Sequence, residues 1–224
     1  MKVLGIIPAR GGSKAIPRKN LVFLGGKPLL AWTCESATQS NLDRVIVSTD
    51  DHEIAELASS HGVEVPFLRP SELSGDLSLT IDAVLHAMRN INEGFDAVMV
   101  LQPTSPFRTT QDINECISLL EESKADSVIS VVDVGGHHPA RMKYLNQGLL
   151  VDPPFVESRE NQPRQELQPM YIRNGAVYLT RTETLQQGSF KGSRSAAHIM
   201  PVDRSINIDE PFDLIVAEAV LGHQ

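Results

Sequence analysis

The segment with the clearest chemical signature spans residues 8–20 and reads PARGGSKAIPRKN. It contains two adjacent glycines, and four cations fall within ten residues: Arg10, Lys14, Arg18 and Lys19. A glycine-rich loop exposes backbone N–H groups and lets an anion approach the main chain, while cations neutralise a polyphosphate. The segment matches neither G-x-x-x-x-G-K-[ST] nor G-x-G-x-x-G. It therefore predicts a phosphate-binding loop of another kind, and the alternative is a solvated basic turn.

The rest of the chain is acidic, with 20 Lys and Arg against 28 Asp and Glu and a formal net charge of -8. Proteins that bind nucleic acids or membrane surfaces are usually basic, so we expect neither partner. No stretch approaches the roughly 20 apolar residues of a membrane span, and the N-terminus lacks the long apolar region of a secretory signal. Cys34 and Cys116 make no disulfide framework or metal-site spacing. These features predict a cytoplasmic protein.

The elements that must position the cationic loop alternate between apolar β-rich runs and helical patterns. Strands are expected at 3–7, 44–48, 62–68, 96–101 and 126–132, and helices at 29–40, 51–61, 79–90 and 110–123. This alternation predicts an α/β fold with a mainly parallel sheet and helices on both faces. Ligands of open α/β sheets gather at the carboxyl ends of the strands, where the loop after the first strand would lie.

The alternation breaks near residue 135. Residues 135–170 are rich in Gly, Pro, His, Arg and Gln and show weak periodicity. Since a structureless loop of this length is unusual inside a compact domain, we expect an extension that leaves the main body toward a partner subunit. The alternative is a floppy surface insertion. Regular structure resumes with strands at 175–180 and 197–202 and a helix at 211–221.

Five stretches, in order, resemble the acylneuraminate cytidylyltransferases, the enzymes that make CMP-sialic acids. They are IIPARGGSKAIPRKN (6–20), FLRPSELSGD (67–76), LQPTSPFR (101–108), YIRNGAVY (171–178) and INID (206–209). The resemblance spans essentially the whole chain, and the related KDO cytidylyltransferases have a different opening loop. It implies a Rossmann-like nucleotidyltransferase fold with a mostly parallel mixed sheet, in a homodimer. Residues 1–224 would form one domain, with 135–173 as a dimerisation and sugar-binding extension.

The implied reaction joins CTP and a nonulosonic acid, giving a CMP-sugar and pyrophosphate. The anomeric hydroxyl attacks the α-phosphorus, a step that needs positioning and charge neutralisation more than covalent catalysis. By resemblance, Arg10 and Lys19 contact the triphosphate and act in catalysis together with Asp209. Other nucleotide-binding residues would be Gly11, Gly12, Ser13, Asn20, Arg69 and Ser74. Lys14 and Arg18 either join them or remain solvated.

A sugar acid carries a carboxylate, which arginine recognises bidentately. The family places an arginine shortly before its Y-x-x-N-G-A stretch at the sugar, and Arg164 matches that position best. Arg173 is a second candidate for the sugar carboxylate, and the alternative is that it has only a structural role. Gln102 follows the strand at 96–101 and is expected to face the sugar or the nucleotide.

The metal site is where the chain departs from the family pattern. Many relatives show Asp-x-Asp, whereas this chain has Asn207-Ile208-Asp209. Mg²⁺ often takes one or two carboxylates plus phosphate oxygens and water, so Asp209 would bind Mg²⁺ or Mn²⁺. Alternation along an extended chain places Asn207 on the same face, where it would offer its amide oxygen or a bound water. The alternative is a capped turn before the last helix.

Two other functions remain open. The chain could be a nucleotidyltransferase for another sugar acid or a sugar phosphate. It could also bind nucleotide without catalysis, which the neutral side chain of Asn207 suggests. Which nonulosonic acid it uses does not follow from the sequence, and neither does the identity of a general base.

Overall fold

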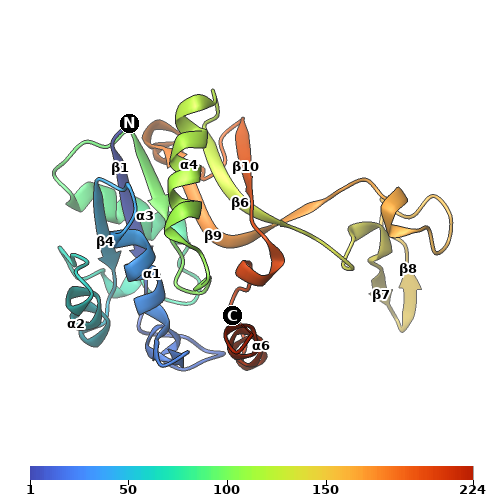
Figure 1. Ribbon diagram of the computed structural model, residues 1–224, viewed down its shortest axis with the longest axis horizontal. Helices are drawn as coiled ribbons and strands as arrows, with labels where there is room; N and C mark the ends of the chain where they lie inside the picture. Colours follow the sequence, from blue (N-terminus) through green and yellow to red (C-terminus); the bar gives the residue numbers. More distant parts are fainter. Residues whose placement is uncertain (224) are drawn as a thin grey trace.

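A six-stranded mixed sheet forms the centre of the computed structural model, which describes residues 1–223 (Figure 1). Its strands are β1 (Val3–Pro8), β4 (Arg44–Ser48), β5 (Ala97–Val100), β6 (Ser127–Asp133), β9 (Tyr171–Arg181) and β10 (Ser195–Ile199). The strand order is β10-β6-β9-β5-β1-β4, and only β9 runs antiparallel to its neighbours. The expectation of a mostly parallel mixed sheet is confirmed.

Helices cover both faces of this sheet. The helices are α1 (Leu29–Thr38), α2 (His52–Ser60), α3 (Thr80–Asn90), α4 (Thr110–Glu122) and α5 (Thr182–Gln186). One apolar cluster joins α1, α2 and α4 to the sheet, and a second joins α3 and α5 to the opposite face. Strands covered on both faces read as continuous apolar runs, and Val3, Leu4 and Ile7 of β1 are accordingly at most 1% exposed.

Three expected elements differ from the sequence reading, one of them being β10, which covers Ser195–Ile199 instead of residues 197–202. Residues 62–68 make only two isolated bridges, Ile46 to Glu64 and Thr49 to Leu68, rather than a strand. Pro66 lies between them and lacks the N–H that a strand ladder needs. Strand β9 begins at Tyr171 instead of residue 175, because its first residues pair with the end of β6.

An arm, residues 134–170, leaves the main body between β6 and β9 and stands clear of it in Figure 1. It contains η3 (Pro139–Arg141), β7 (Tyr144–Asn146), β8 (Leu149–Val151) and η4 (Arg164–Glu166). Gln147 and Gly148 join β7 to β8 with φ values of 48° and 82°, as a two-residue hairpin turn requires. The predicted extension is therefore present, and its role in dimerisation stays a prediction.

The last helix, α6 (Pro211–Leu221), brings the chain end beside the opening loop. Glu210 and Asp213 form a capping box that starts the helix. Buried Leu24, Ile208 and Ala217 belong to one apolar cluster, so α6 packs on the segment around the small hairpin of β2 (Phe23–Leu24) and β3 (Lys27–Pro28). No helix within residues 1–223 is long and apolar enough to cross a membrane.

Candidate active site

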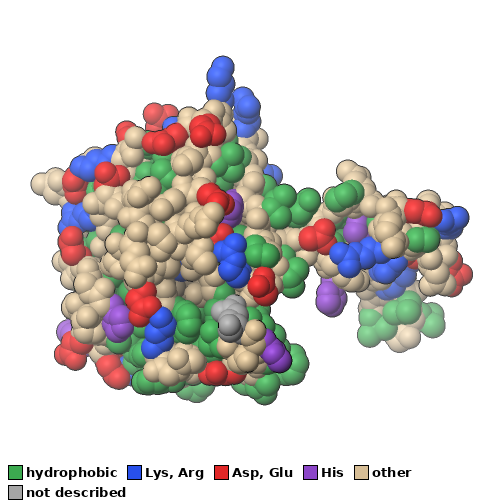
Figure 2. Space-filling view, viewed as in Figure 1, with side chains coloured by type: hydrophobic (Ala, Val, Ile, Leu, Met, Phe, Trp, Pro, Cys, Tyr) green, Lys and Arg blue, Asp and Glu red, His purple; other side chains and the backbone are tan. Residues whose placement is uncertain are grey.

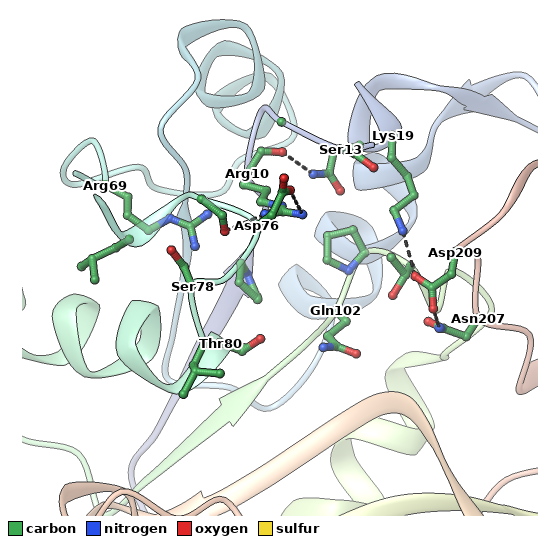
Figure 3. Close-up of a pocket in the computed structure, with 18 residues that line it drawn as sticks. Arg10, Ser13, Lys19, Arg69, Asp76, Ser78, Thr80, Gln102, Asn207 and Asp209 are labelled. Atoms are coloured by element: carbon green, nitrogen blue, oxygen red, sulfur yellow. Dashed lines mark hydrogen bonds and ion pairs between the residues drawn. The ribbon is translucent and has the colours of Figure 1, made fainter. Parts of the chain in front are cut away.

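A cavity of about 370 Å³ opens at the carboxyl ends of β1 and β5 (Figure 3). Four segments line it, within residues 8–20, 69–80, 102–104 and 207–209. Within the sheet, β4 pairs with one edge of β1, and β5, which comes later in the chain, pairs with the other edge. The loops that follow β1 and β5 therefore diverge, which is where open α/β sheets bind ligands.

Two of the expected cations lie in this cavity and are paired with carboxylates. Arg10 donates from Nη1 to the Gly75 carbonyl at 2.7 Å, and its Nη2 lies 3.1 Å from Asp76 Oδ1. Lys19 donates from Nζ to the Ile208 carbonyl at 2.8 Å and to Asp209 Oδ1 at 2.9 Å. Each contact joins the opening loop to a segment at least 65 residues away, so the fold assembles this set.

Arg69 is the third cation of the cavity and is only 7% exposed. Its Nη2 donates to the Ser48 carbonyl at 3.1 Å, while its buried Nε has no hydrogen-bond partner among the described residues. Burial lowers the pKa of Arg69, although nearby Asp50 opposes this shift. A buried guanidinium with an unused donor is well suited to an anionic ligand.

The two cations left open by the sequence lie outside the cavity. Lys14 pairs with Asp76 at 2.7 Å, and its side chain is 82% exposed. Arg18 turns toward the start of α2, where it pairs with Asp51 at 3.2 Å and Glu53 at 2.8 Å. Arg18 therefore ties the loop to α2.

Gly11 and Ser74, both expected at the nucleotide, do not line the cavity. The Gly11 amide donates to Asp50 Oδ1 at 3.0 Å, and a Cβ at Gly11 would lie 2.6 Å from Asp51 Oδ2. Gly11 is thus needed for the close approach of the loop to α2. Ser74 Oγ donates to the Pro70 carbonyl at 3.2 Å. Neither residue presents its bonded group to the cavity.

Gly12, Ser13 and Asn20 do line the cavity, as expected. Asn20 is buried, and its Nδ2 donates to the Arg10 carbonyl at 2.9 Å. This bond closes the loop on itself and holds the backbone that carries Arg10. Asn20 therefore shapes the loop as well as lining the cavity.

The loop after β5 carries Gln102 into the cavity and is supported from below. Arg108, 2% exposed, donates to the Ala176 carbonyl at 2.7 Å and to Thr33 Oγ1 at 2.8 Å. Burial lowers the pKa of Arg108 to about 10. Gly175 has a φ of 80°, and a Cβ there would lie 2.9 Å from Gln102 Oε1. Glycine at this position leaves room for the Gln102 side chain.

Asn207 and Asp209 share the far wall of the cavity, facing Lys19 (Figure 3). Asn207 Nδ2 donates to Asp209 Oδ2 at 2.5 Å. The Asp209 side chain is 64% exposed, so its oxygens remain accessible from the cavity. Within residues 1–223, no group of three or more His, Cys, Asp or Glu side chains is arranged to hold a metal ion. The expected amide-oxygen ligand at Asn207 is instead turned away, with the amide nitrogen toward Asp209.

Arg164 and Arg173, the expected sugar-binding arginines, lie away from the cavity of their own chain. Arg164 belongs to the arm, where its Nη2 lies 3.2 Å from Asp133 Oδ1. Arg173 is exposed near the start of β9. One chain thus brings together most of the predicted nucleotide residues, with Gly11 and Ser74 as exceptions, but does not bring these two arginines to them.

Several cavity residues were not singled out from the sequence: Leu73, Ser78, Leu79 and Thr80. Leu73 belongs to the FLRPSELSGD stretch, and the other three lie just after it, at the start of α3. Leu79 is 63% exposed. The position of Ser78, Leu79 and Thr80 at the beginning of a predicted helix was the available signal, but nothing local showed that the helix start faces the opening loop.

Comparison with known proteins identifies the class to which this fold and cavity belong. The family described as cytidylyltransferase matches residues 4–187, so the chain belongs to this family. The expected membership of the acylneuraminate cytidylyltransferase family is supported by relatives that are 33–34% identical to this chain. A CMP-N,N'-diacetyllegionaminic acid synthase of Legionella pneumophila is 34% identical over 99% of this chain and 97% of its own length.

Two N-acylneuraminate cytidylyltransferases are also similar. The Streptococcus agalactiae serotype V protein is 34% identical over 100% of this chain, and the Escherichia coli O18:K1:H7 protein is 33% identical over 96%. The matched regions cover 53% and 51% of those proteins, so the chain spans about half of their length. It spans nearly all of the Legionella protein.

Solved structures support the fold. A CMP:2-keto-3-deoxy-manno-octonic acid synthetase complexed with CTP superposes with a TM-score of 0.76 at 18% identity, covering 100% of this chain and 99% of the other. A 4-diphosphocytidyl-2C-methyl-D-erythritol synthase from Anaerococcus prevotii superposes with a TM-score of 0.70 at 14% identity, covering 99% and 96%. The nucleotidyltransferase fold expected from the sequence is confirmed.

Proposed function

We propose that this protein transfers CMP from CTP to the anomeric hydroxyl of a sialic-acid-like nonulosonic acid and releases pyrophosphate. The observation that carries the proposal is the convergence of Arg10, Lys19 and Arg69 on one cavity at the carboxyl ends of β1 and β5. The full-length similarity to a CMP-N,N'-diacetyllegionaminic acid synthase supports this choice of substrate class.

The charges of the cavity suit a triphosphate. Asp76 pairs with Arg10, and Asp209 pairs with Lys19, so carboxylates now occupy the positions that phosphate oxygens would take. Exchange of one anion for another preserves charge-assisted hydrogen bonds, which are the strong ones. Such donors, aimed at the phosphates, would stabilise the charge that develops on the leaving pyrophosphate.

Mg²⁺, or Mn²⁺ in its place, is the cofactor that we propose for this reaction. Asp209 fits the role, because Mg²⁺ is commonly bound by one or two carboxylates together with substrate phosphates and water. Its exposed carboxylate faces the cavity, and a carboxylate has about four lone-pair sites for two present donors. When bound, the ion would neutralise phosphate charge during transfer.

The sugar side of the site requires a second chain in our proposal. Tyr144, Leu145, Leu149 and Leu150 of the arm are 60–75% exposed. Figure 2 shows hydrophobic side chains gathered at the tip of the arm, over the β7–β8 hairpin. We infer that this surface packs on another copy in a homodimer. Arg164, which lies on the same arm, would then serve the sugar carboxylate of that copy.

The test is pyrophosphate release with CTP, Mg²⁺ and a panel of nonulosonic acids that includes N,N'-diacetyllegionaminic and N-acetylneuraminic acids. UTP, ATP and GTP serve as nucleotide controls, and an Asp209→Asn variant serves as the matched control for the metal site. We expect release with CTP and one sugar acid, and strongly reduced release from the variant.

Two results would contradict the proposal. Release with a sugar phosphate, or with another sugar acid and none of the nonulosonic acids, would move the protein to a different nucleotidyltransferase class. CTP binding without release for any sugar would indicate a nucleotide-binding protein that is not an enzyme.

A further inference from the structure

The carboxamide of Asn207 lies between Asp209 and Ser105. Its Nδ2 donates to Asp209 Oδ2 at 2.5 Å, and its Oδ1 lies 3.4 Å from Ser105 Oγ. A carboxylate oxygen only accepts hydrogen bonds, so the amide nitrogen must be the end that faces Asp209. The amide oxygen, the one side-chain atom of Asn207 able to bind a cation, points instead toward Ser105.

The surface below Asn207 is rigid. Ser105 is fully buried, and its single hydroxyl proton is shared between the Asn174 carbonyl at 3.1 Å and, at the longer distance of 3.4 Å, Asn207 Oδ1. Gly175 provides the space for this arrangement, since a Cβ there would lie 3.2 Å from Ser105 Oγ and 3.4 Å from Asn207 Oδ1. Asn207 therefore stands on groups whose own positions are set by the end of the β5 loop and by β9.

The carboxylate of Asp209, by contrast, has little support of its own. It is 64% exposed, and its two oxygens are bonded to Lys19 Nζ and Asn207 Nδ2 respectively. The Lys19 cation is the group expected to move toward a triphosphate. Asn207 would then be the remaining side chain that holds the carboxylate in one orientation.

We propose that Asn207 is a positioning residue that orients the Asp209 carboxylate toward the cavity, and that Asn207 is not itself a metal ligand. The inference rests on the proposed function, because it concerns how Asp209 serves the Mg²⁺–CTP complex. In this arrangement, Asp209 is the single charged metal ligand that residues 207–209 provide. The metal then binds mainly together with the nucleotide phosphates.

A ligand and a positioning residue differ in what their loss changes. Loss of a ligand weakens metal binding, and excess metal restores the rate. Loss of orientation lowers kcat even at saturating metal, because the reacting groups are misplaced in the bound complex. The two roles can therefore be separated by measuring metal-dependent binding and turnover in the same variants.

The experiment compares Asn207→Ala, Ser105→Ala and Asp209→Asn with the unmodified protein. CTP affinity is measured by calorimetry with saturating Mg²⁺ and with EDTA, without sugar, and kcat is measured over a range of Mg²⁺ concentrations. The tightening of CTP binding by Mg²⁺ should stay within about twofold in Asn207→Ala, while kcat falls roughly tenfold and extra Mg²⁺ does not restore it. Asp209→Asn should lose most of the tightening.

Ser105→Ala keeps the test open if Asn207→Ala does not fold, which thermal melting will show. It should have the same pattern with a smaller loss of kcat, about threefold, because the Asn207 amide keeps its bond to Asp209. Ser105→Ala also removes the donor to the buried Asn174 carbonyl, so its thermal melting is measured in parallel. The proposal is overturned if Asn207→Ala loses the Mg²⁺-dependent tightening and excess Mg²⁺ restores kcat, or if kcat does not change. Absence of Mg²⁺-dependent CTP binding in the unmodified protein would instead overturn the proposed function.

Discussion

The wall of the cavity and the arm are both built mainly from segments outside the central sheet. The cations of the cavity are paired or buried within the chain, whereas the apolar side chains of the arm are exposed. In the cavity, Arg10 and Lys19 are paired within the chain, and Arg108 beneath them is buried against carbonyl oxygens. In the arm, Leu145 and Leu150 face each other across a hairpin and are 75% and 74% exposed. The cavity cations thus find carboxylate partners within one chain, whereas the apolar tip of the arm stays exposed on it.

The largest effect is expected from the cavity cations. Lys19→Ala removes a side chain that is 14% exposed and contacts both Ile208 and Asp209. We expect kcat to fall by about 10²–10³, the loss typical of a preorganised donor at developing charge. Lys14→Ala is the matched control, because Lys14 is 82% exposed and outside the cavity. Equal losses in the two variants would show that general charge, and not position, matters.

The arm can be tested by breaking its apolar tip. The double variant Leu145→Asp, Leu150→Asp should sediment as a monomer, because charges on a buried interface are costly. Turnover with the sugar should fall about a hundredfold if a second copy supplies the arginine for the carboxylate, while CTP affinity stays the same. Ile215→Asp, at an exposed apolar position of α6, is the control and should remain a dimer. A monomeric variant with full turnover would show that one chain suffices.

Two glycines with nearly equal φ allow a direct comparison of the regions. Gly175 lies under the cavity with a φ of 80°, and Gly148 lies in the arm turn with a φ of 82°. Gly148→Ala has open space around its Cβ, so only backbone strain remains, worth about 1 kcal/mol. Gly175→Ala adds a collision with Gln102, for about 2 kcal/mol or more in total. Urea unfolding measures the loss of unfolding free energy in both variants. Equal losses would show that the Gln102 side chain moves away from the new Cβ at little cost.

The last effect, similar in size to that of the glycines, concerns a buried carboxylate behind the cavity. Burial alone would raise the pKa of Asp112, but hydrogen bonds from His198 and Thr109 and the charge of Arg204 outweigh it and hold the pKa well below its usual range. A lowered pKa in the folded state stabilises the protein above the unfolded pKa, and this stability is lost as the pH falls further. Asp112→Asn should cost about 1–2 kcal/mol at neutral pH, and the difference should shrink below about pH 4.

Denaturant unfolding across that pH range measures the effect. Asp152→Asn is the control from the arm, where Asp152 pairs with Lys143 on the surface. Exposed pairs contribute little, so this variant should match the unmodified protein at every pH. A cost for Asp112→Asn that stays constant down to low pH would contradict the role of its charge.

Local sequence was enough for the elements that have strong local signals. The apolar strands β1, β5 and β6 are buried on both faces, and such runs are recognisable without tertiary information. The start of α4 follows Thr109, whose side chain and that of Asp112 form a capping box within three residues. Residues 62–68 failed as a strand because pairing at a sheet edge depends on the neighbour as well as on composition.

The composition of residues 8–20 alone indicated an anion-binding loop, whereas the INID stretch was assigned to a metal site through the family resemblance. Tertiary structure decided which groups of these stretches face the cavity. Gly11 and Arg18 turn to α2, Asp76 pairs with Arg10, and the Asn207 amide turns its nitrogen to Asp209. These contacts depend on which segments the fold brings together, often from opposite ends of the chain, and no local pattern encodes the direction in which a side chain finds its partner.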